Sequence, residues 1–340
     1  MTYWMVLCLT YVSSLLSKKS LDLLILSILF IMAAFISPNV SHDFQNYYNG
    51  YYNLNGGLFP EPLSKVIFNG AKIWGLDIAA SFFALAMISI FLKIKALRKL
   101  GIPISLFMMI YFSKLFLLLD LTQVRAAIAV SFCLLAFDSY IKNKRMASTL
   151  YIFFAFLFHL SSILFFVIFL FNKNKPNVIV WVLSLLIGVC VSFVDIKSYL
   201  LMLMTFIHAP ANYFVYLSDG SGLSVNPFNA LAVINVFIFL LFCFFNDRIV
   251  SDGMHLAFKL YGVSIISFYV FIDFPVLSFR ISEFFLVYQV VLLCGLLSSI
   301  KYSQRWLYIT IIFLYSMVQL YLTYNKASII EPYSMTINIF

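Results

Sequence analysis

Apolar runs of about 20 residues recur along the whole chain, and they restrict its fold more than any other feature. Hydrophobic residues make up 64% of the 340 residues and charged residues 10%, whereas a soluble domain has about 25% charged residues. A run of that length can cross the hydrocarbon core of a bilayer as a helix. The sequence therefore predicts an all-α polytopic membrane protein with roughly 10–12 transmembrane or re-entrant helices.

Most basic residues lie in short segments between these runs, which explains the net charge of +9 without any nucleic-acid partner. Clusters of Lys and Arg mark cytoplasmic loops in membrane proteins. Lys18 and Lys19, the run 93–99 and the run 142–145 are such clusters. The N-terminus and the segment that follows Ile36 are therefore predicted to lie outside.

The chain is predicted to form one integral membrane domain, residues 1–340, with two larger extracytoplasmic loops at 37–77 and 195–227. The first loop is rich in Asn, Gly and Tyr, so we expect short helical pieces there and no span. Within the second, residues 198–207 are apolar but too short to cross. We expect them to lie on the outer surface or to dip into it.

Residues 147–171 allow two interpretations. A single long span would place Lys173 and Lys175 outside, against the positive-inside pattern. A helical hairpin with His159 at its outer tip would keep both lysines inside, and broken helices are tolerated where they line a protein cavity. The charge pattern favours the hairpin.

Arg125 lies near the start of an apolar helix, LTQVRAAIAVSFCLLAF. A charge there costs free energy unless it faces water, a counter-ion or a ligand, and the small residues after it let neighbouring helices approach closely. We expect Arg125 at the outer edge of the membrane, where it can hold an anionic lipid head group. The alternative is a snorkelling side chain. Since no anionic partner is evident, a purely structural protein is disfavoured.

The other ionisable residues outside the basic loops are predicted to gather with Arg125 on the outer side. They are His42, Asp43, Glu61, Asp120, His159, Asp195, Lys197, His208, Asp219, Asp273, Arg280, Glu283 and Glu331. Each has a structural alternative. Arg280 and Glu283, three residues apart, can pair on one helix, His159 can be an interior hydrogen-bonded histidine, and Lys114 is expected to pair with Asp120.

Four tyrosines in the first loop form a separate group: Tyr47, Tyr48, Tyr51 and Tyr52. They are predicted either to anchor the loop in the membrane interface, as an aromatic belt does, or to form a platform for sugar rings. The sequence leaves both interpretations open.

Several kinds of chemistry leave no sign in the sequence. It contains no P-loop, no glycine-rich dinucleotide turn and no metalloprotease motif, and the five cysteines are singly placed, so neither a metal nor a cofactor is expected. Any reaction would use a substrate that is already activated and already in the membrane. A polyprenyl diphosphate-linked sugar meets both conditions, and guanidinium groups bind its phosphate oxygens in a bidentate fork.

Several segments, taken in order from Ser37 to the C-terminus, resemble the EpsG-like branch of the Wzy-type polysaccharide polymerases. They are SHDFQNYY, FPEPLSKVIF, QVRAAIAVSF, FHLSSILFF, SFRISEFF and IIEPYS. The family often has Gln after the arginine of the third segment, where this chain has Ala126.

The resemblance implies growth of a surface glycan (O-antigen, capsule or exopolysaccharide) at the outer face of the bacterial cytoplasmic membrane. Donor and acceptor would be undecaprenyl diphosphate-linked oligosaccharides, and membrane lipids and a chain-length regulator are candidate partners. Arg125 and Arg280 would bind the donor diphosphate and stabilise its growing charge. His159, or else Glu61 or Asp43, would take the proton of the acceptor hydroxyl.

Two other functions remain open. A ligase that moves finished glycan onto another acceptor would share the spans and the outer loops. A non-enzymatic flippase or transporter of lipid-linked glycan would often show two related halves, and no such repeat is visible. Polar residues predicted on one side favour chemistry at the membrane surface.

Overall fold

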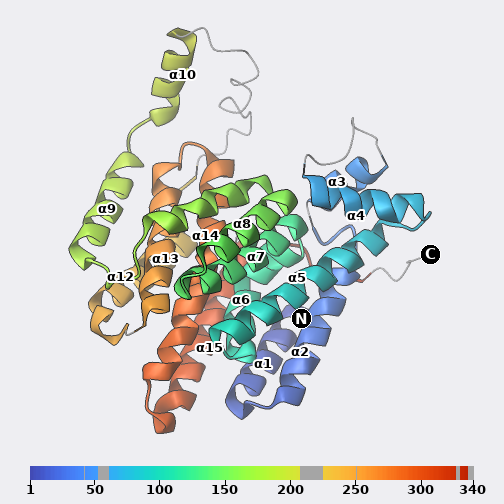
Figure 1. Cartoon of the computed structure of the whole chain (residues 1–340), viewed down its shortest axis with the longest axis horizontal. Helices are drawn as coiled ribbons and strands as arrows, with labels where there is room; N and C mark the ends of the chain where they lie inside the picture. The colour runs from blue at the N-terminus through green and yellow to red at the C-terminus, as the bar shows by residue number, and fades with distance from the viewer. Residues whose placement is uncertain (42, 53–60, 207–224, 250, 327–329, 336–340) are drawn as a thin grey trace. The chain divides into compact units, whose positions relative to one another are not determined.

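The structure, a computed structural model, describes residues 1–41, 43–52, 61–206, 225–249, 251–326 and 330–335, which form helices and two isolated β-bridges. Figure 1 shows the course of the chain. Among the described residues, five helices are long and apolar enough to cross a membrane: Ile78–Leu100, Val124–Ile141, Asp252–Val270, Pro275–Ser299 and Tyr302–Asn325. The predicted all-α polytopic membrane protein is confirmed.

The chain forms two compact units. The first consists of Met1–Asn172 and Val290–Phe340, and the second of Lys173–Gln289. The prediction of one membrane domain over the whole chain stays a prediction.

The first unit begins with a hairpin of two helices, α1 (Thr2–Leu16) and α2 (Lys19–Ala34). Its turn contains Ser17 in a left-handed conformation (φ 51°), with the backbone N–H bonded to the carbonyl of Ser13. α2 packs against α5 (Ile78–Leu100), and α1 packs against α6 (Ile104–Tyr111) and α15 (Arg305–Tyr321).

α5 is longer than the span predicted at 78–92. It begins at Asp77, whose side chain accepts a hydrogen bond from the amide of Ala79, and it ends at Gly101 with φ 67°. Lys93 therefore lies inside the helix, and it is buried. Its assignment to a cytoplasmic basic loop was wrong, because a buried polar partner allows a lysine to continue the span.

The chain then returns through α6 and a π-helix, η1 (Phe112–Asp120), whose nine residues are all buried. This return lets α7 (Val124–Ile141) run parallel to α5. Ser131 Oγ donates to the carbonyl of Ser89 (3.3 Å), and Lys142 Nζ donates to that of Lys99 (3.3 Å). The two helices are therefore matched in register over their length.

Residues 145–171 form the predicted hairpin. α8 (Arg145–Phe158) ends at His159, which is extended (φ −155°, ψ 117°), and a 3₁₀-helix, η2 (Leu160–Leu170), follows. Ser148 Oγ near the start of the hairpin donates to the carbonyl of Ala136, and Tyr140 OH donates to the carbonyl of Phe171 at its end. Both ends of the hairpin therefore lie beside the end of α7, and His159 lies at the tip.

The predicted outer loop at 37–77 contains two short helices, α3 (Phe44–Tyr51) and α4 (Pro62–Ile73), as expected. α4 packs on α3, α5 and α8. The C-terminal tail lies beside the start of this segment, through bridges between Ile36 and Met335 and between Ser41 and Ile330. The tail and the first loop thus share one end of the unit.

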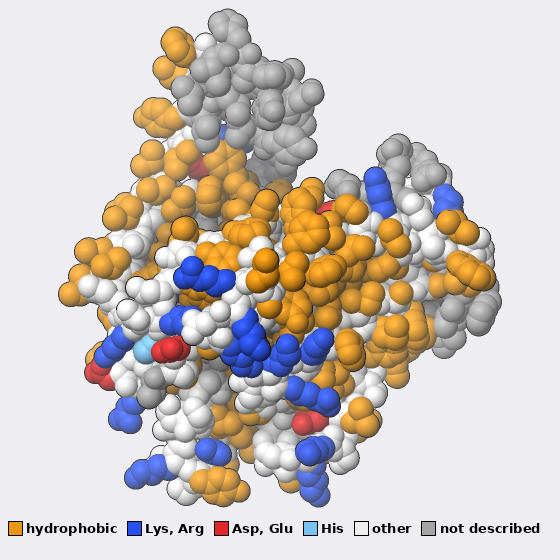
Figure 2. Space-filling view, viewed as in Figure 1, with side chains coloured by type: hydrophobic (Ala, Val, Ile, Leu, Met, Phe, Trp, Pro, Cys, Tyr) orange, Lys and Arg blue, Asp and Glu red, His pale blue; other side chains and the backbone are white. Residues whose placement is uncertain are grey.

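The opposite end of the first unit carries basic helix termini. The α1–α2 turn, the end of α5 and the end of α7 have exposed lysines at Lys18, Lys99 and Lys142. In Figure 2 a cluster of Lys and Arg side chains over this unit lies in the lower half of the view, with a broad hydrophobic surface above it. The observed separation agrees with the predicted basic inner loops. The membrane side itself stays a prediction.

In the second unit, α9 (Val178–Val191) and α12 (Ala230–Phe244) pack against α13 (Asp252–Val270). α10 (Ile196–Phe206) is too short to span, as expected, and its N-terminus is capped by Asp273, which accepts from the amide of Ile196 at 2.8 Å. Most of the second predicted loop, with His208 and Asp219, lies outside the described residues, as does His42 of the first. The remaining elements are η3 (Asn246–Arg248), α14 (Pro275–Leu296), η4 (Leu297–Ser299), η5 (Tyr302–Gln304) and η6 (Leu322–Lys326).

Candidate active site

Four polar side chains from separate segments of the first unit meet at one point, and we call them the Glu61 cluster: Tyr47, Glu61, Arg125 and His159. Arg125 Nη1 forms an ion pair with Glu61 Oε2. His159 Nδ1 lies 3.6 Å from Glu61 Oε1. Arg125 Nε donates to Tyr47 OH at 3.5 Å, and the guanidinium carbon lies 5.4 Å from the centre of the Tyr47 ring. One carboxylate therefore faces a guanidinium on one oxygen and an imidazole on the other.

Local structure places three of the four members of the cluster at the end of a helix, whereas Tyr47 lies within α3. Glu61 is the N-cap of α4, and Pro62 occupies the first helical position, which suits its fixed φ. Arg125 is in the first turn of α7, and His159 is the C-cap of α8. Ser64 Oγ donates to the carbonyl of Phe158 at 3.2 Å, so α4 is fastened to the hairpin tip.

The centre of the cluster, Glu61, is buried, whereas Arg125 and His159 at its edges are partly exposed to solvent. The Glu61 side chain is 5% exposed, whereas those of Arg125 and His159 are 18% and 16% exposed. Burial acts to raise the pKa of Glu61, but the neighbouring His159 and Arg125 outweigh it and hold that pKa below its usual value. Glu61 is therefore an anion at neutral pH and a poor base.

His159 is placed to act with Glu61. Its Nδ1 has no hydrogen-bond partner among the described residues, and the 3.6 Å to Glu61 is just beyond hydrogen-bond reach. Such contacts often tighten when substrate binds. A proton on Nδ1 directed at Glu61 leaves Nε2 as an acceptor, so the pair can abstract a proton.

The expectation that Arg125 lacks an anionic partner was wrong. Its partner, Glu61, lies 64 positions earlier in the chain. α4 packs against α8, and α8 packs against α7, which brings Glu61 to Arg125, and local spacing gave no sign of it. Because Arg125 has this partner, the arginine does not by itself exclude a purely structural protein.

The four tyrosines of α3 and its end fall into two pairs. Tyr47 and Tyr51 are buried, and Tyr51 OH donates to the carbonyl of Leu76 at 2.7 Å. Tyr48 and Tyr52 are 39% and 41% exposed, with ring centres 4.6 Å apart. Tyr48 and Tyr52 are thus the two whose rings can contact a ligand, while Tyr47 and Tyr51 pack inside the unit.

Two predicted site residues remain, Asp43 in the first unit and Arg280 in the second. Asp43 is half-buried at the start of α3 and accepts from Asn46 Nδ2 at 3.4 Å. Arg280 is an exposed residue of α14, three positions before Glu283. Arg280 belongs to the second unit, so its proximity to Arg125 stays a prediction.

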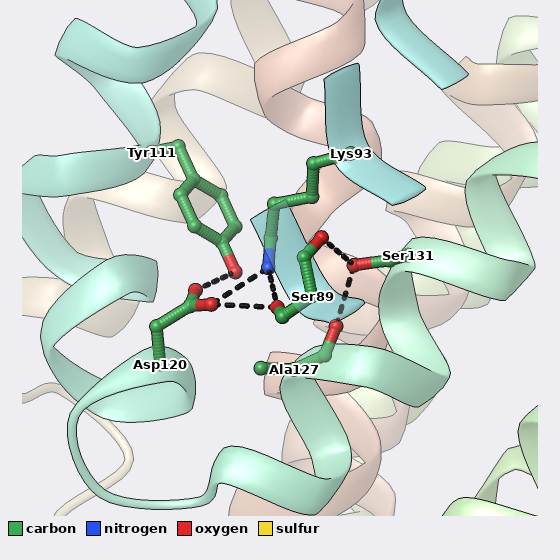
Figure 3. A network of polar contacts seen from close by, with 6 residues as sticks. All are labelled: Ser89, Lys93, Tyr111, Asp120, Ala127 and Ser131. Atoms are coloured by element: carbon green, nitrogen blue, oxygen red, sulfur yellow. Dashed lines mark hydrogen bonds and ion pairs between the residues drawn. The ribbon is translucent and has the colours of Figure 1, made fainter. Parts of the chain in front are cut away.

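Sequence reasoning missed a second polar group, inside the helix bundle of the first unit (Figure 3). Lys93 Nζ lies 2.8 Å from Asp120 Oδ1, and both side chains are 1% exposed. Lys93, not Lys114, is thus the partner of Asp120, and Asp120 does not join the outer residues. A signal was present, because Ser89 and Lys93 are four residues apart and share one face of the α5 helix.

Fold and site together define a polytopic helical membrane protein with a partly accessible mixed-charge site at the end of its first unit, away from the basic helix termini. A model of the EpsG family matches residues 19–335, and the chain belongs to that family. No curated protein and no solved structure matched the chain. Membership supports a role of the polysaccharide-polymerase type in general.

Proposed function

We propose that this protein joins lipid-linked oligosaccharide repeat units into a surface polysaccharide at the outer face of the bacterial cytoplasmic membrane. The donor is a glycan linked to undecaprenyl diphosphate, and a second lipid-linked unit supplies the acceptor hydroxyl. The Glu61 cluster carries the proposal, because it combines a cation suited to diphosphate with a histidine suited to proton transfer. Membership of the EpsG family supports the activity class.

In the proposed reaction His159 is the general base. As the acceptor oxygen bonds to the anomeric carbon of the donor, Nε2 of His159 takes the hydroxyl proton. Glu61 orients the imidazole through Nδ1 and stabilises the imidazolium that forms. The lowered pKa of Glu61 argues against its acting as the base itself, and Asp43 remains a further candidate.

Arg125 acts on the leaving group. The bond between the anomeric carbon and the diphosphate oxygen breaks, and undecaprenyl diphosphate leaves with the electron pair. A guanidinium beside that oxygen stabilises the growing negative charge. In the absence of substrate Glu61 neutralises Arg125. We assign Arg280 to the other side of the diphosphate and the exposed rings of Tyr48 and Tyr52 to packing against sugar rings.

The test is polymer length in cells carrying Arg125→Ala, Arg280→Ala or His159→Ala at normal protein level. We expect each to stop growth at a single repeat unit on the acceptor, with a loss of about 100-fold or more in polymer formation. Arg98→Ala is the matched control, because Arg98 is exposed at the basic end of α5 and should leave polymer unchanged.

Other outcomes would contradict parts of the proposal. Long-chain polymer in an arginine variant rejects that arginine as a diphosphate ligand, and wild-type length in His159→Ala removes it as the base. Unattached polymer would indicate a ligase. Lipid-linked repeat trapped on the cytoplasmic side would indicate a transporter.

A further inference from the structure

The proposed reaction does not use the buried polar side chains shown in Figure 3. We call four of them the Asp120 cluster: Ser89, Lys93, Tyr111 and Asp120. Asp120 Oδ1 accepts from Lys93 Nζ at 2.8 Å and from Ser89 Oγ at 2.7 Å. Asp120 Oδ2 accepts from Tyr111 OH at 2.7 Å. The carboxylate is therefore bonded on both oxygens, by residues of α5 and α6.

A buried ion pair is an expensive way to stabilise a helix bundle. Replacing such a pair by apolar residues of similar size is often neutral or stabilising, whereas removing one partner is costly. Charges within membrane helices are rare for the same reason. Stability alone does not account for the pair of Lys93 and Asp120. The pair does hold the surrounding backbone in a fixed geometry.

The geometry that it fixes is the entry to α7. Asp120 is the last residue of the π-helix η1, and π-helices are rare and occur frequently at functional sites. After it the chain turns, with the amide of Gln123 bonded to the carbonyl of Leu118 at 2.9 Å. α7 then begins at Val124, so Arg125 follows Asp120 by five residues.

A second contact holds α7 on the same part of α5. Ser131 Oγ donates to the carbonyls of Ala127 (2.7 Å) and Ser89 (3.3 Å), and Ser89 also binds Asp120. The first turns of α7 are thus held against α5 from both sides of Arg125.

We infer that Lys93 and Asp120 are positioning residues, whose ion pair holds the turn between η1 and α7 so that the Arg125 guanidinium lies against Glu61. The consequence for catalysis rests on the proposed function, whereas the placement of the turn does not. A displacement of about 1 Å at a reacting centre can cost roughly 100-fold in rate. Loss of the pair therefore lowers turnover, although neither Lys93 nor Asp120 contacts the substrate.

The main experiment removes both charges together. Lys93→Met/Asp120→Asn leaves no uncompensated buried charge, so the protein should still fold. We expect turnover per folded molecule to fall by about tenfold to 100-fold. In an Arg125→Ala background the same double change should add less than about twofold, because both changes act through one side chain. Unchanged turnover, or full additivity with Arg125→Ala, overturns the inference.

A second measurement is independent of polymerase activity. Hydrogen exchange of the amides of residues 121–127, in protein reconstituted into vesicles, should be about tenfold faster in the double variant. Ser113→Ala is the matched control, because Ser113 is a buried serine of η1 whose hydroxyl, among the residues that the structure describes, donates to the carbonyl of Ile110. Unchanged exchange overturns the inference even if the protein is a polymerase. Faster exchange supports it even if the protein is not.

If the double variant does not fold, Tyr111→Phe is measured in its place. It removes one hydrogen bond to Asp120 and keeps the ion pair. We expect the same two changes, smaller in size, and wild-type exchange and turnover would count against the inference.

Discussion

Glu61 faces both the predicted diphosphate ligand, Arg125, and the predicted general base, His159. Arg125 and His159 lie 34 positions apart and belong to different helices, yet both face its carboxylate. The sequence offered Glu61 as one of several bases. Its buried position between the Arg125 guanidinium and the His159 imidazole makes it an orienting and neutralising group instead, because a carboxylate with a lowered pKa rarely takes a proton.

Glu61→Gln tests this electrostatic role. The folded-state pKa of Glu61 is below its ordinary value of 4.5. Its stabilising effect is therefore present at neutral pH and is lost as pH falls through the folded pKa. We expect the variant to lose about 1–3 kcal/mol at pH 7, and the difference from wild type should shrink below about pH 4.5.

The measurement is thermal unfolding in detergent across the pH range. Glu331→Gln is the control, because Glu331 is an exposed carboxylate and should change stability little at any pH. A Glu61→Gln difference that stays constant from pH 7 down to pH 3 would contradict the ionic explanation.

At the scale of elements, α9 and α13 of the second unit pack closely at two glycines, one on each helix. Gly262 of α13 lies beneath the ring of Trp181 from α9, and a Cβ at that position would overlap the ring. Gly188 of α9 differs, because a Cβ there would lie 3.6 Å from Ile266, an ordinary contact. The same helix pair thus contains one glycine that packing requires and one that it does not.

Gly262→Ala should therefore destabilise the protein by about 1–3 kcal/mol through overpacking, while Gly188→Ala should be neutral or slightly stabilising. Thermal unfolding of the two variants in the same detergent makes the comparison. Equal effects at both positions would show that the Trp181 contact does not limit the approach of α9 and α13.

At the scale of the whole molecule, the prediction that remains is the membrane side of the site. In the first unit, basic helix termini lie at one end and the Glu61 cluster at the other. The positive-inside pattern then places the cluster outside the cell.

Single cysteines in a cysteine-free background test this orientation, because Cys8 and Cys190 are exposed in the natural chain. An impermeant thiol reagent added to intact cells should label Tyr48→Cys. Arg98→Cys should be labelled only after the cells are permeabilised. Labelling of Arg98→Cys alone in intact cells would reverse the orientation and place the reaction in the cytosol.

The sequence by itself determined the helical membrane class, the short helices at 37–77 and the hairpin at 147–171, because apolar run length and charge placement are local properties. It also selected Arg125, His159 and Glu61 and predicted that they gather on one side of the membrane, but not which of them are in contact. Only the tertiary structure decided that Glu61 joins the other two, that Lys93 pairs with Asp120, and that Tyr47 is buried while Tyr48 is exposed. These pairings connect residues 27 to 98 positions apart, from Lys93–Asp120 to Glu61–His159, and in an apolar bundle they depend on how helices pack, which no local pattern encodes.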